Sequence, residues 1–282
     1  MSTARKCEKV AFTMLGLATL LTVAPILLTI LYIVKNGAAG VSWEFISQAP
    51  RNGMREGGIF PAIVGTLLLI IGTMVFSLPL GILSAIYLVE YARDNVFTRL
   101  IKLSVVNLSG IPSIIYGLFG FTLFVMFLKL GTSILAGSLT LAIMSLPVII
   151  TATKEALETV PHSFRQISLS LGATKWQTIR HCVLPYAIPG ILTGTVLSLS
   201  RAAGETAPIL FTVAAFYLPR LPHSVFEQAM ALPYHLYVIS TQVPNIPMKT
   251  SFATALVLIV LVFLMNLVSI VLRAHYRKKR QW

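Results

Sequence analysis

The sequence predicts an all-α integral membrane protein with six transmembrane helices, and two observations lead to this prediction. The 282 residues are 56% hydrophobic and only 11% charged, whereas soluble domains are roughly 45–50% apolar and about 25% charged. In addition, several apolar stretches exceed the roughly 20 helical residues that cross a bilayer core about 30 Å thick. These stretches lie at about residues 10–34, 61–89, 103–128, 134–152, 186–216 and 251–272.

The first stretch follows a basic N-tail of residues 1–9 and is expected to be a retained anchor. Its apolar run is longer than the roughly 7–15 residues of a cleavable signal peptide, and no small-residue cleavage site follows it. Cys7 and Cys182 fit neither a disulfide framework nor a CxxC pair. The five histidines show no metal-ligand spacing, so no metal site is expected.

The basic residues predict an orientation in the membrane. Lys and Arg outnumber Asp and Glu by 22 to 9, which gives a formal net charge of +13. With the N-terminus inside, 15 of the 22 basic residues fall in cytoplasmic segments, six in outer segments and one in a span. The positive-inside rule then places both termini, including a C-tail of residues 273–282, in the cytoplasm. Short basic runs between spans form no soluble basic stripe, which argues against nucleic-acid binding.

The third span contains the segment GIPSIIYGL at residues 110–118. Its proline and glycines are expected to loosen a helix at this point, and such breaks are tolerated beside neighbouring helices or a water-lined cavity. Ser113 and Tyr116 offer hydroxyl groups that could donate to a passing anion. The alternative is that each hydroxyl makes an ordinary hydrogen bond in helix packing.

The longest cytoplasmic segment, residues 153–185, predicts two short helices joined by a glycine turn. Ser163 and Gln166 have the spacing of a capping box that would start the first helix. Gly172 is placed to end that helix, and Thr174 with Gln177 offers a second capping box. The segment is either a connecting loop resting on the lipid headgroups or a docking element for a soluble partner.

This loop resembles the EAA loop of ABC-importer permeases, whose pattern is EAA, three residues, Gly, nine residues and I-x-L-P. Gly172 and the Leu184-Pro185 pair stand at the expected offsets, while residues 166–168 read QIS in place of EAA and Cys182 replaces the isoleucine. In that family the loop is the coupling helix, which sits in a groove of the ATP-hydrolysing subunit. The resemblance implies a coupling surface from Gln166 to Trp176. The residues it assigns to coupling are Gln166, Leu171, Gly172, Ala173, Thr174, Lys175, Trp176, Leu184 and Pro185.

The fifth span contains two charged residues in SRAAGETAPILFT, at residues 200–212. Arg201 is expected near the middle of this span, with Glu205 one helical turn later on the same face. A charge at the bilayer centre costs about 2.5–3.5 kcal/mol on insertion scales, so such residues usually face a cavity and have a function. An arginine fork suits an oxyanion, and Glu205 could position Arg201, tune its charge or compete for it. The alternative is an ion pair that only fixes packing.

Three segments, GGIFPAIVGT at residues 57–66 and the two segments of the third and fifth spans, resemble the phosphate-specific branch of these permeases. The GETAP sequence resembles the A-type permease subunit. The resemblance implies a type I (MetI-like) importer bundle in a bacterial or archaeal plasma membrane, which moves inorganic phosphate by alternating access. The translocation residues it suggests are Arg201, Glu205, Ser113 and Tyr116.

The resemblance also implies partners. These are a C-type sister permease, two ATPase subunits that use ATP and magnesium, and an extracytoplasmic phosphate-binding protein. The chain itself is expected to bind no cofactor, and it contains no GxxxxGK[ST] phosphate loop. Moving one charge against the membrane potential costs about 2.3 kcal/mol per 100 mV, so the energy must come from a separate ATPase or from a coupled ion. We favour the ATPase, because the sequence shows no inverted repeats of the kind that ion-coupled carriers usually have.

Other functions stay open at this point. They are a permease for another oxyanion, an ion-coupled carrier, a passive anion channel and a membrane-embedded enzyme. An enzyme would need a nucleophile or metal with an acid or base partner, and the spans offer no convincing set. In the outer segment 217–250, the capping-box spacing of Ser224 and Glu227 suggests a short helix at the interface, although we favour a loop that covers the bundle.

Overall fold

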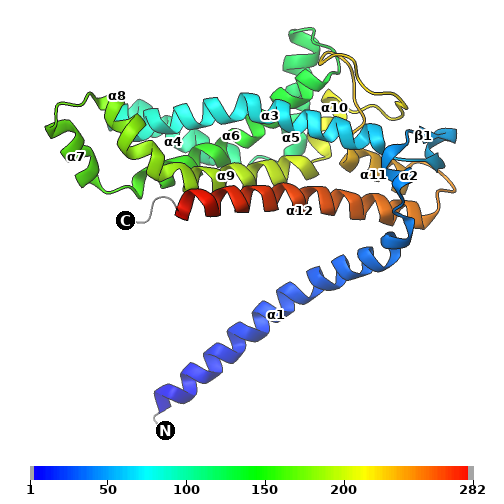
Figure 1. Cartoon of the computed structure of the whole chain (residues 1–282), viewed down its shortest axis with the longest axis horizontal. Coiled ribbons are helices and arrows are strands. Elements are labelled where there is room, and N and C mark those ends of the chain that lie inside the picture. Colours follow the sequence, from blue (N-terminus) through cyan, green and yellow to red (C-terminus); the bar gives the residue numbers. More distant parts are fainter. Residues whose placement is uncertain (1–2, 279–282) are drawn as a thin grey trace.

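The computed structural model describes residues 3–278 and shows an all-α bundle, as predicted (Figure 1). Four long helices form the centre of the bundle, where α3 packs on α6, α6 on α9 and α9 on α12. The long helices are α1 (Thr3–Gly37), α3 (Phe60–Ile86), α4 (Val96–Ser109), α6 (Ile134–Glu158), α9 (Leu184–Gly204) and α12 (Met248–Lys278).

Shorter elements close the two ends of the bundle. The short helices are α2 (Trp43–Ser47), α5 (Ser113–Gly120), α7 (His162–Ser170), α8 (Lys175–Thr178), α10 (Ala207–Thr212) and α11 (Leu232–Thr241). Two 3-10 turns are η1 (Ala38–Gly40) and η2 (Asn52–Met54), and three π-helical stretches are η3 (Tyr87–Tyr91), η4 (Phe121–Phe127) and η5 (Ile179–Val183). A two-residue hairpin pairs β1 (Pro50–Arg51) with β2 (Glu56–Gly57).

The elements separate into two ends along the bundle (Figure 1). The hairpin, α2 and α11 lie at one end, and α7 and α8 lie at the other. Helix α1 begins, and α12 ends, toward the α7 end. Near its C-terminus α1 packs against α12, where the rings of Tyr32 and Phe252 meet edge to face at 5.4 Å, and from there α1 diverges from the bundle.

Five helices of the described chain are long and apolar enough to cross a membrane, and a bent pair of helices makes a sixth if it is counted as one span. In this pair α4 and the α5–η4 segment meet at 106°. The expected single helix over residues 103–128 is therefore wrong. The backbone of Pro112 is extended, and a proline in a helix interior removes one hydrogen-bond donor and clashes with the preceding turn. The hydroxyl of Tyr116 donates to the Leu108 carbonyl at 2.7 Å and so holds the bend.

The fifth span is also broken, which corrects the prediction of one helix over residues 186–216. Helix α9 ends at Gly204, Glu205 is extended, and α10 begins at Ala207. The physical cause is Pro208, because a proline ring clashes with the carbonyl four residues earlier, here that of Gly204. Arg201 therefore lies in the last turn of a helix and not in the middle of one.

Close contact between α6 and α9 depends on two glycines. A Cβ atom built on Gly194 would lie 2.1 Å from the Cβ of Ala152, and one on Gly190 would lie 2.5 Å from the Cβ of Ala156. Real Cβ atoms do not approach so closely. Small residues of this kind let helix backbones approach each other in membranes.

Residues 217–231 form a loop that covers the start of α6, as favoured from the sequence, but the rest of the segment 217–250 contains α11, which was not predicted. Ser224 and Glu227 form a turn and not a helix, since the amide of Glu227 donates to the Ser224 carbonyl at 3.2 Å with no helix continuing from it. The amides of Ile134 and Leu135 donate to the carbonyls of Glu227 and Val225, both at 2.9 Å. The loop thus satisfies donors at the start of α6 that no helix carbonyl can reach.

Candidate functional site

The two broken spans meet inside the bundle. Helix α5 packs against α10, and a Cβ atom at Gly117 would lie 2.9 Å from the Ala207 carbonyl oxygen and 3.0 Å from the Cα of Pro208. The segments GIPSIIYGL and SRAAGETAPILFT therefore touch, although they are about 90 residues apart in the chain. Irregular backbone at membrane depth is tolerated where it is buried in protein or lines a water-filled cavity.

Arg201 lies near this meeting point, and only the Nε atom of its guanidinium makes a hydrogen bond within residues 3–278. Its Nε donates to Oε1 of Glu205 at 3.3 Å. The Arg201 side chain is 48% exposed and that of Glu205 is 15% exposed. Within residues 3–278 the guanidinium makes no other hydrogen bond, so its two terminal amino groups can still donate. That pair of donors is the one that binds an oxyanion through two parallel hydrogen bonds.

The depth of Arg201 follows from its neighbours on α9. Leu199 and Ala203 pack in one cluster with Ile70 of α3. Ile70 is ten residues after Phe60, the first residue of α3, which is about 15 Å along a helix. Tyr91, at the other end of this span, is about 30 Å away by the same measure. The arginine therefore lies inside the span, nearer to the α11 end than to the α7 end.

Tyr116 lies on α5, which packs against α10, the helix that directly follows Arg201 and Glu205 in the chain. Tyr116 is buried, and its proton is donated to Leu108. The Tyr116 hydroxyl is thus not free to donate to an anion in this conformation. Ser113 is partly buried at the start of α5, one turn before Tyr116. The roles of Ser113 and Tyr116 in translocation stay predictions.

At the α7 end of the bundle, the predicted helix–turn–helix is present as α7 and α8. The first capping box is wrong: α7 begins at His162 after Pro161, which has no side-chain acceptor, and Ser163 is an exposed residue inside the helix. The second box is present. The amide of Thr174 donates to Oε1 of Gln177 at 2.8 Å, and the amide of Gln177 donates to Oγ1 of Thr174 at 3.3 Å.

The three residues that replace EAA, Gln166, Ile167 and Ser168, differ in how buried they are. Ser168 is buried and its hydroxyl lies 2.9 Å from the hydroxyl of Thr178, which ties α7 to α8. Gln166 and Ile167 are exposed. A small side chain is therefore needed at the third position, while the first two face outward and can contact a partner. Leu184 packs among the buried residues that join α3, α6 and α9, and Pro185 lies in the first turn of α9.

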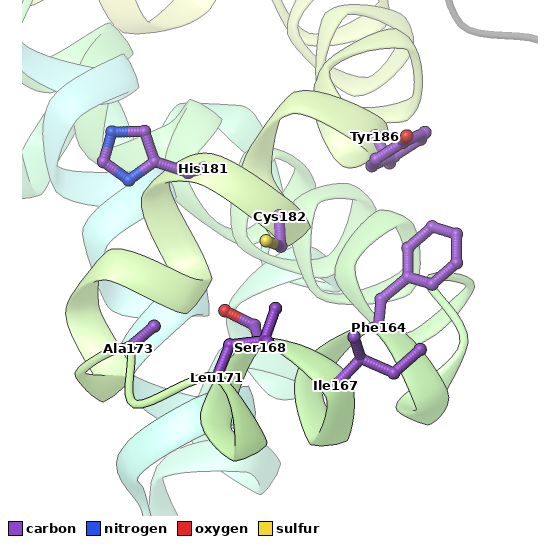
Figure 2. A pocket seen from close by; sticks show the side chains of 8 residues that line it. All are labelled: Phe164, Ile167, Ser168, Leu171, Ala173, His181, Cys182 and Tyr186. Atoms are coloured by element: carbon purple, nitrogen blue, oxygen red, sulfur yellow. The ribbon is translucent and has the colours of Figure 1, made fainter.

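An apolar cavity of about 460 Å³ lies between α7 and the start of α9 (Figure 2). In Figure 2, Phe164 and Ile167 come from α7, and Cys182 and Tyr186 come from the segment that follows α8. Leu171 at its edge is 83% exposed, and Ile167 and Trp176 are exposed too. Exposed apolar side chains on a rigid hairpin are typical of a surface that another protein covers. The lining residues are Phe164, Ile167, Ser168, Leu171, Ala173, His181, Cys182 and Tyr186.

One buried ion pair at this end was missed from the sequence. Arg165 on α7 binds Glu90 in η3, with 2.7 Å between the Nη2 and Oε1 atoms. The two residues are 75 positions apart. No local pattern reports such a pair, because it depends on how α3, α6 and α7 pack together.

Gly172 provides a test of the hairpin. Its φ of +84° lies in the left-handed region, and nothing is within 4 Å of the position a Cβ would take. Substitution there is limited by the backbone and not by space, and costs about 1–2 kcal/mol for an ordinary residue. Gly172→Ala and Gly172→Leu should weaken binding of an ATPase partner about equally, and Gly172→Asn should do so less. Co-purification of the partner measures this. A much larger effect of Leu than of Ala would contradict the backbone explanation.

The chain matches known proteins over most of its length. The family described as "Binding-protein-dependent transport system inner membrane component" matches residues 77–281. A probable ABC transporter permease, YqgI of Bacillus subtilis, is 33% identical over 271 residues, covering 91% of this chain and 92% of that protein. The phosphate transport system permease protein PstA 1 of Mycobacterium tuberculosis is 37% identical over 226 residues, covering 80% and 72%.

Among solved structures, a bacterial ABC transporter that imports the acidic polysaccharide alginate has a chain of similar fold. The TM-score is 0.67, with 17% identity, and the match covers 96% of this chain and 99% of that chain. At this identity the likeness supports the fold alone, which is that of an importer permease. The sequence matches show that this chain belongs to the family of inner-membrane components of binding-protein-dependent transport systems.

Proposed function

We propose that this chain is the membrane-spanning permease subunit of an ATP-driven importer that moves inorganic phosphate into the cell by alternating access. The observation that carries the proposal is the arrangement around Arg201. This arginine lies on an exposed face of α9, beside two broken spans, and its Nε donates to Glu205 while its two terminal amino groups make no hydrogen bond within residues 3–278. The phosphate permeases among its relatives support phosphate as the oxyanion.

The geometry suggests how the anion is held and released. A tetrahedral oxyanion that enters beside Arg201 accepts two hydrogen bonds from the terminal amino groups, which offset part of the water it loses. Glu205 keeps its hydrogen bond to the Nε of Arg201 and so orients the two terminal amino groups toward the anion. Because Glu205 and the anion compete for the same cation, the complex is not so tight that release becomes slow. Ser113 and Tyr116 border this route in the proposal.

The energy comes from outside the chain, which has no GxxxxGK[ST] phosphate loop. In this proposal an ATPase closes on ATP and magnesium and moves the surface from Gln166 to Trp176. The bundle then exposes the Arg201 region first outward and then inward. The proposed partners are two such ATPase subunits, a C-type sister permease and an extracytoplasmic phosphate-binding protein. The chain is proposed to be non-catalytic, to bind no cofactor and to have both termini in the cytoplasm.

Membership of a binding-protein-dependent transport family does not favour a passive channel or a membrane enzyme. The deciding experiment has two stages. Pull-down in mild detergent should bring an ATPase and a second six-span chain with this protein. Proteoliposomes of the purified complex, with the binding protein present, should then take up labelled phosphate only with ATP. Downhill flux through this chain alone, without ATP, would instead support a channel.

A further inference from the structure

Arg165 joins three elements at the cytoplasmic end of the bundle. From α7, its Nε and Nη2 donate to Oε1 of Glu90 in η3 at 2.9 and 2.7 Å. Its Nη1 donates to the Val160 carbonyl at 2.8 Å, and its Nη2 also donates to the Leu157 carbonyl at 3.0 Å. Leu157 lies in the last turn of α6, and Val160 lies two residues after the end of that helix. One guanidinium thus bonds α7 to both α3 and α6.

The arginine and its partner are well buried. The side chain of Arg165 is 13% exposed and that of Glu90 is 8% exposed. A buried pair of this kind costs desolvation and is a poor source of net stability, but removing one partner leaves the other charge uncompensated. The pair is therefore better explained by the geometry it imposes than by stability.

A second contact, from α8, also holds η3. Lys175 on α8 places its Nζ 4.9 Å from the ring centroid of Tyr91, the last residue of η3. Both helices of the hairpin therefore contact residues 87–91. Helix α7 does so through the ion pair with Glu90, and α8 through the Lys175–Tyr91 contact. Because Ser168 and Thr178 also bind α7 to α8, the hairpin and this end of the span form one connected unit.

We propose that Arg165 is the positioning residue through which movement of the α7–α8 hairpin passes into α3 and α6. This inference rests on the proposed function, in which an ATPase moves the hairpin. Without the four hydrogen bonds, α7 could follow the ATPase while α3 and α6 stay in place. ATP would then be hydrolysed with little transport. Lysine cannot replace the arginine, because an ammonium is a point charge without the planar fork that reaches Glu90 and two carbonyls together.

The test compares Arg165→Lys and Glu90→Gln with a matched control, Lys154→Gln. Lys154 forms a second ion pair at this end of the described chain, a 3.8 Å contact with Glu158 on the same helix, and this pair is partly exposed. In proteoliposomes of each assembled complex, phosphate transported per ATP hydrolysed is measured. We expect Arg165→Lys to lower this ratio at least about tenfold and Glu90→Gln, which keeps a neutral acceptor, about threefold. The control should match the wild type.

Amide hydrogen exchange of residues 87–91 and 162–170 in the purified complexes gives a second readout that needs no transport. Both segments should exchange faster in Arg165→Lys than in the control. A wild-type ratio in the surviving complex, even at low yield, would show that the pair only helps folding and would overturn the proposal. If Arg165→Lys does not assemble at all, an unchanged ratio in Glu90→Gln overturns it equally. Failure of the proposed function would show differently, as ATP-independent uptake by the wild type.

Discussion

Replacing Arg201 by alanine should abolish phosphate uptake, with a fall of at least about a hundredfold, while the complex still assembles. Removing one preorganised donor from an anion site costs about 10²–10³ in rate where such losses have been measured, and here both terminal amino groups are lost. The side chain is 48% exposed and packs little, so truncating it should cost little folding stability. Uptake of labelled phosphate at equal amounts of assembled complex is the measurement.

Three further variants sharpen this prediction. Arg201→Lys should restore little uptake, because it keeps the charge but not the fork. Glu205→Gln should reduce uptake less than Arg201→Ala does, since the arginine and both of its amino groups remain. Arg220→Ala is the matched control: Arg220 also pairs with a glutamate, Glu227 at 3.6 Å, but in the outer loop. Wild-type uptake by Arg201→Ala would reduce Arg201 to a packing residue.

Gly194→Ala should sharply reduce the amount of folded protein, since even one methyl group has no room. The added Cβ would lie 2.1 Å from the Cβ of Ala152 on α6, and α6 and α9 would have to separate along their contact. Overpacking a tight site costs about 1–3 kcal/mol and can cost more. The yield of monodisperse protein in detergent and its thermal unfolding temperature report the loss.

The clash also predicts a rescue. In the double variant Ala152→Gly with Gly194→Ala, the methyl group moves from one helix to the other and the space is restored. This variant should recover most of the lost stability. Gly16→Ala, at a position with nothing within 4 Å, should behave like the wild type. If Gly194→Ala were as stable as Gly16→Ala, the close approach of α6 and α9 would be wrong.

The broad architecture could be predicted because it depends on composition and local chemistry. An apolar stretch of sufficient length predicts a transmembrane span, whichever helices pack beside it. The α7–α8 hairpin was predictable for the same reason: the Thr174 capping box and the positive φ of Gly172 are set by a few consecutive residues. The start of α7 was missed because Pro161 sets it, while the Ser163 and Gln166 pattern has the right spacing in the wrong place.

The breaks inside the spans were only partly predictable. Pro112 and Pro208 are visible in the sequence, but a proline can kink a helix, end it or stand in its first turn. Which of these occurs depends on what receives the freed carbonyl and amide groups. Here the bend at Pro112 is held by Tyr116, and the break before Pro208 packs against Gly117. Both are contacts between separate segments.

Of the residues proposed for translocation and coupling, some could be predicted from the sequence and others could not. Arg201 and Glu205 stood out because a charge in an apolar run is costly wherever it faces, and their ion pair is present. Arg165 did not stand out, since an arginine in a cytoplasmic loop is ordinary by sequence. Its proposed role rests on the ion pair with Glu90 and the hydrogen bond to Leu157 in the last turn of α6, which only the packed structure displays.

The most direct test of the account is phosphate uptake into proteoliposomes containing this chain with and without its proposed partners. We expect accumulation only when the sister permease, the ATPase, ATP and the binding protein are all present, and none when Arg201 is replaced by alanine. Accumulation by this chain alone, or equal ATP-driven accumulation with and without the Arg201 side chain, would contradict the account.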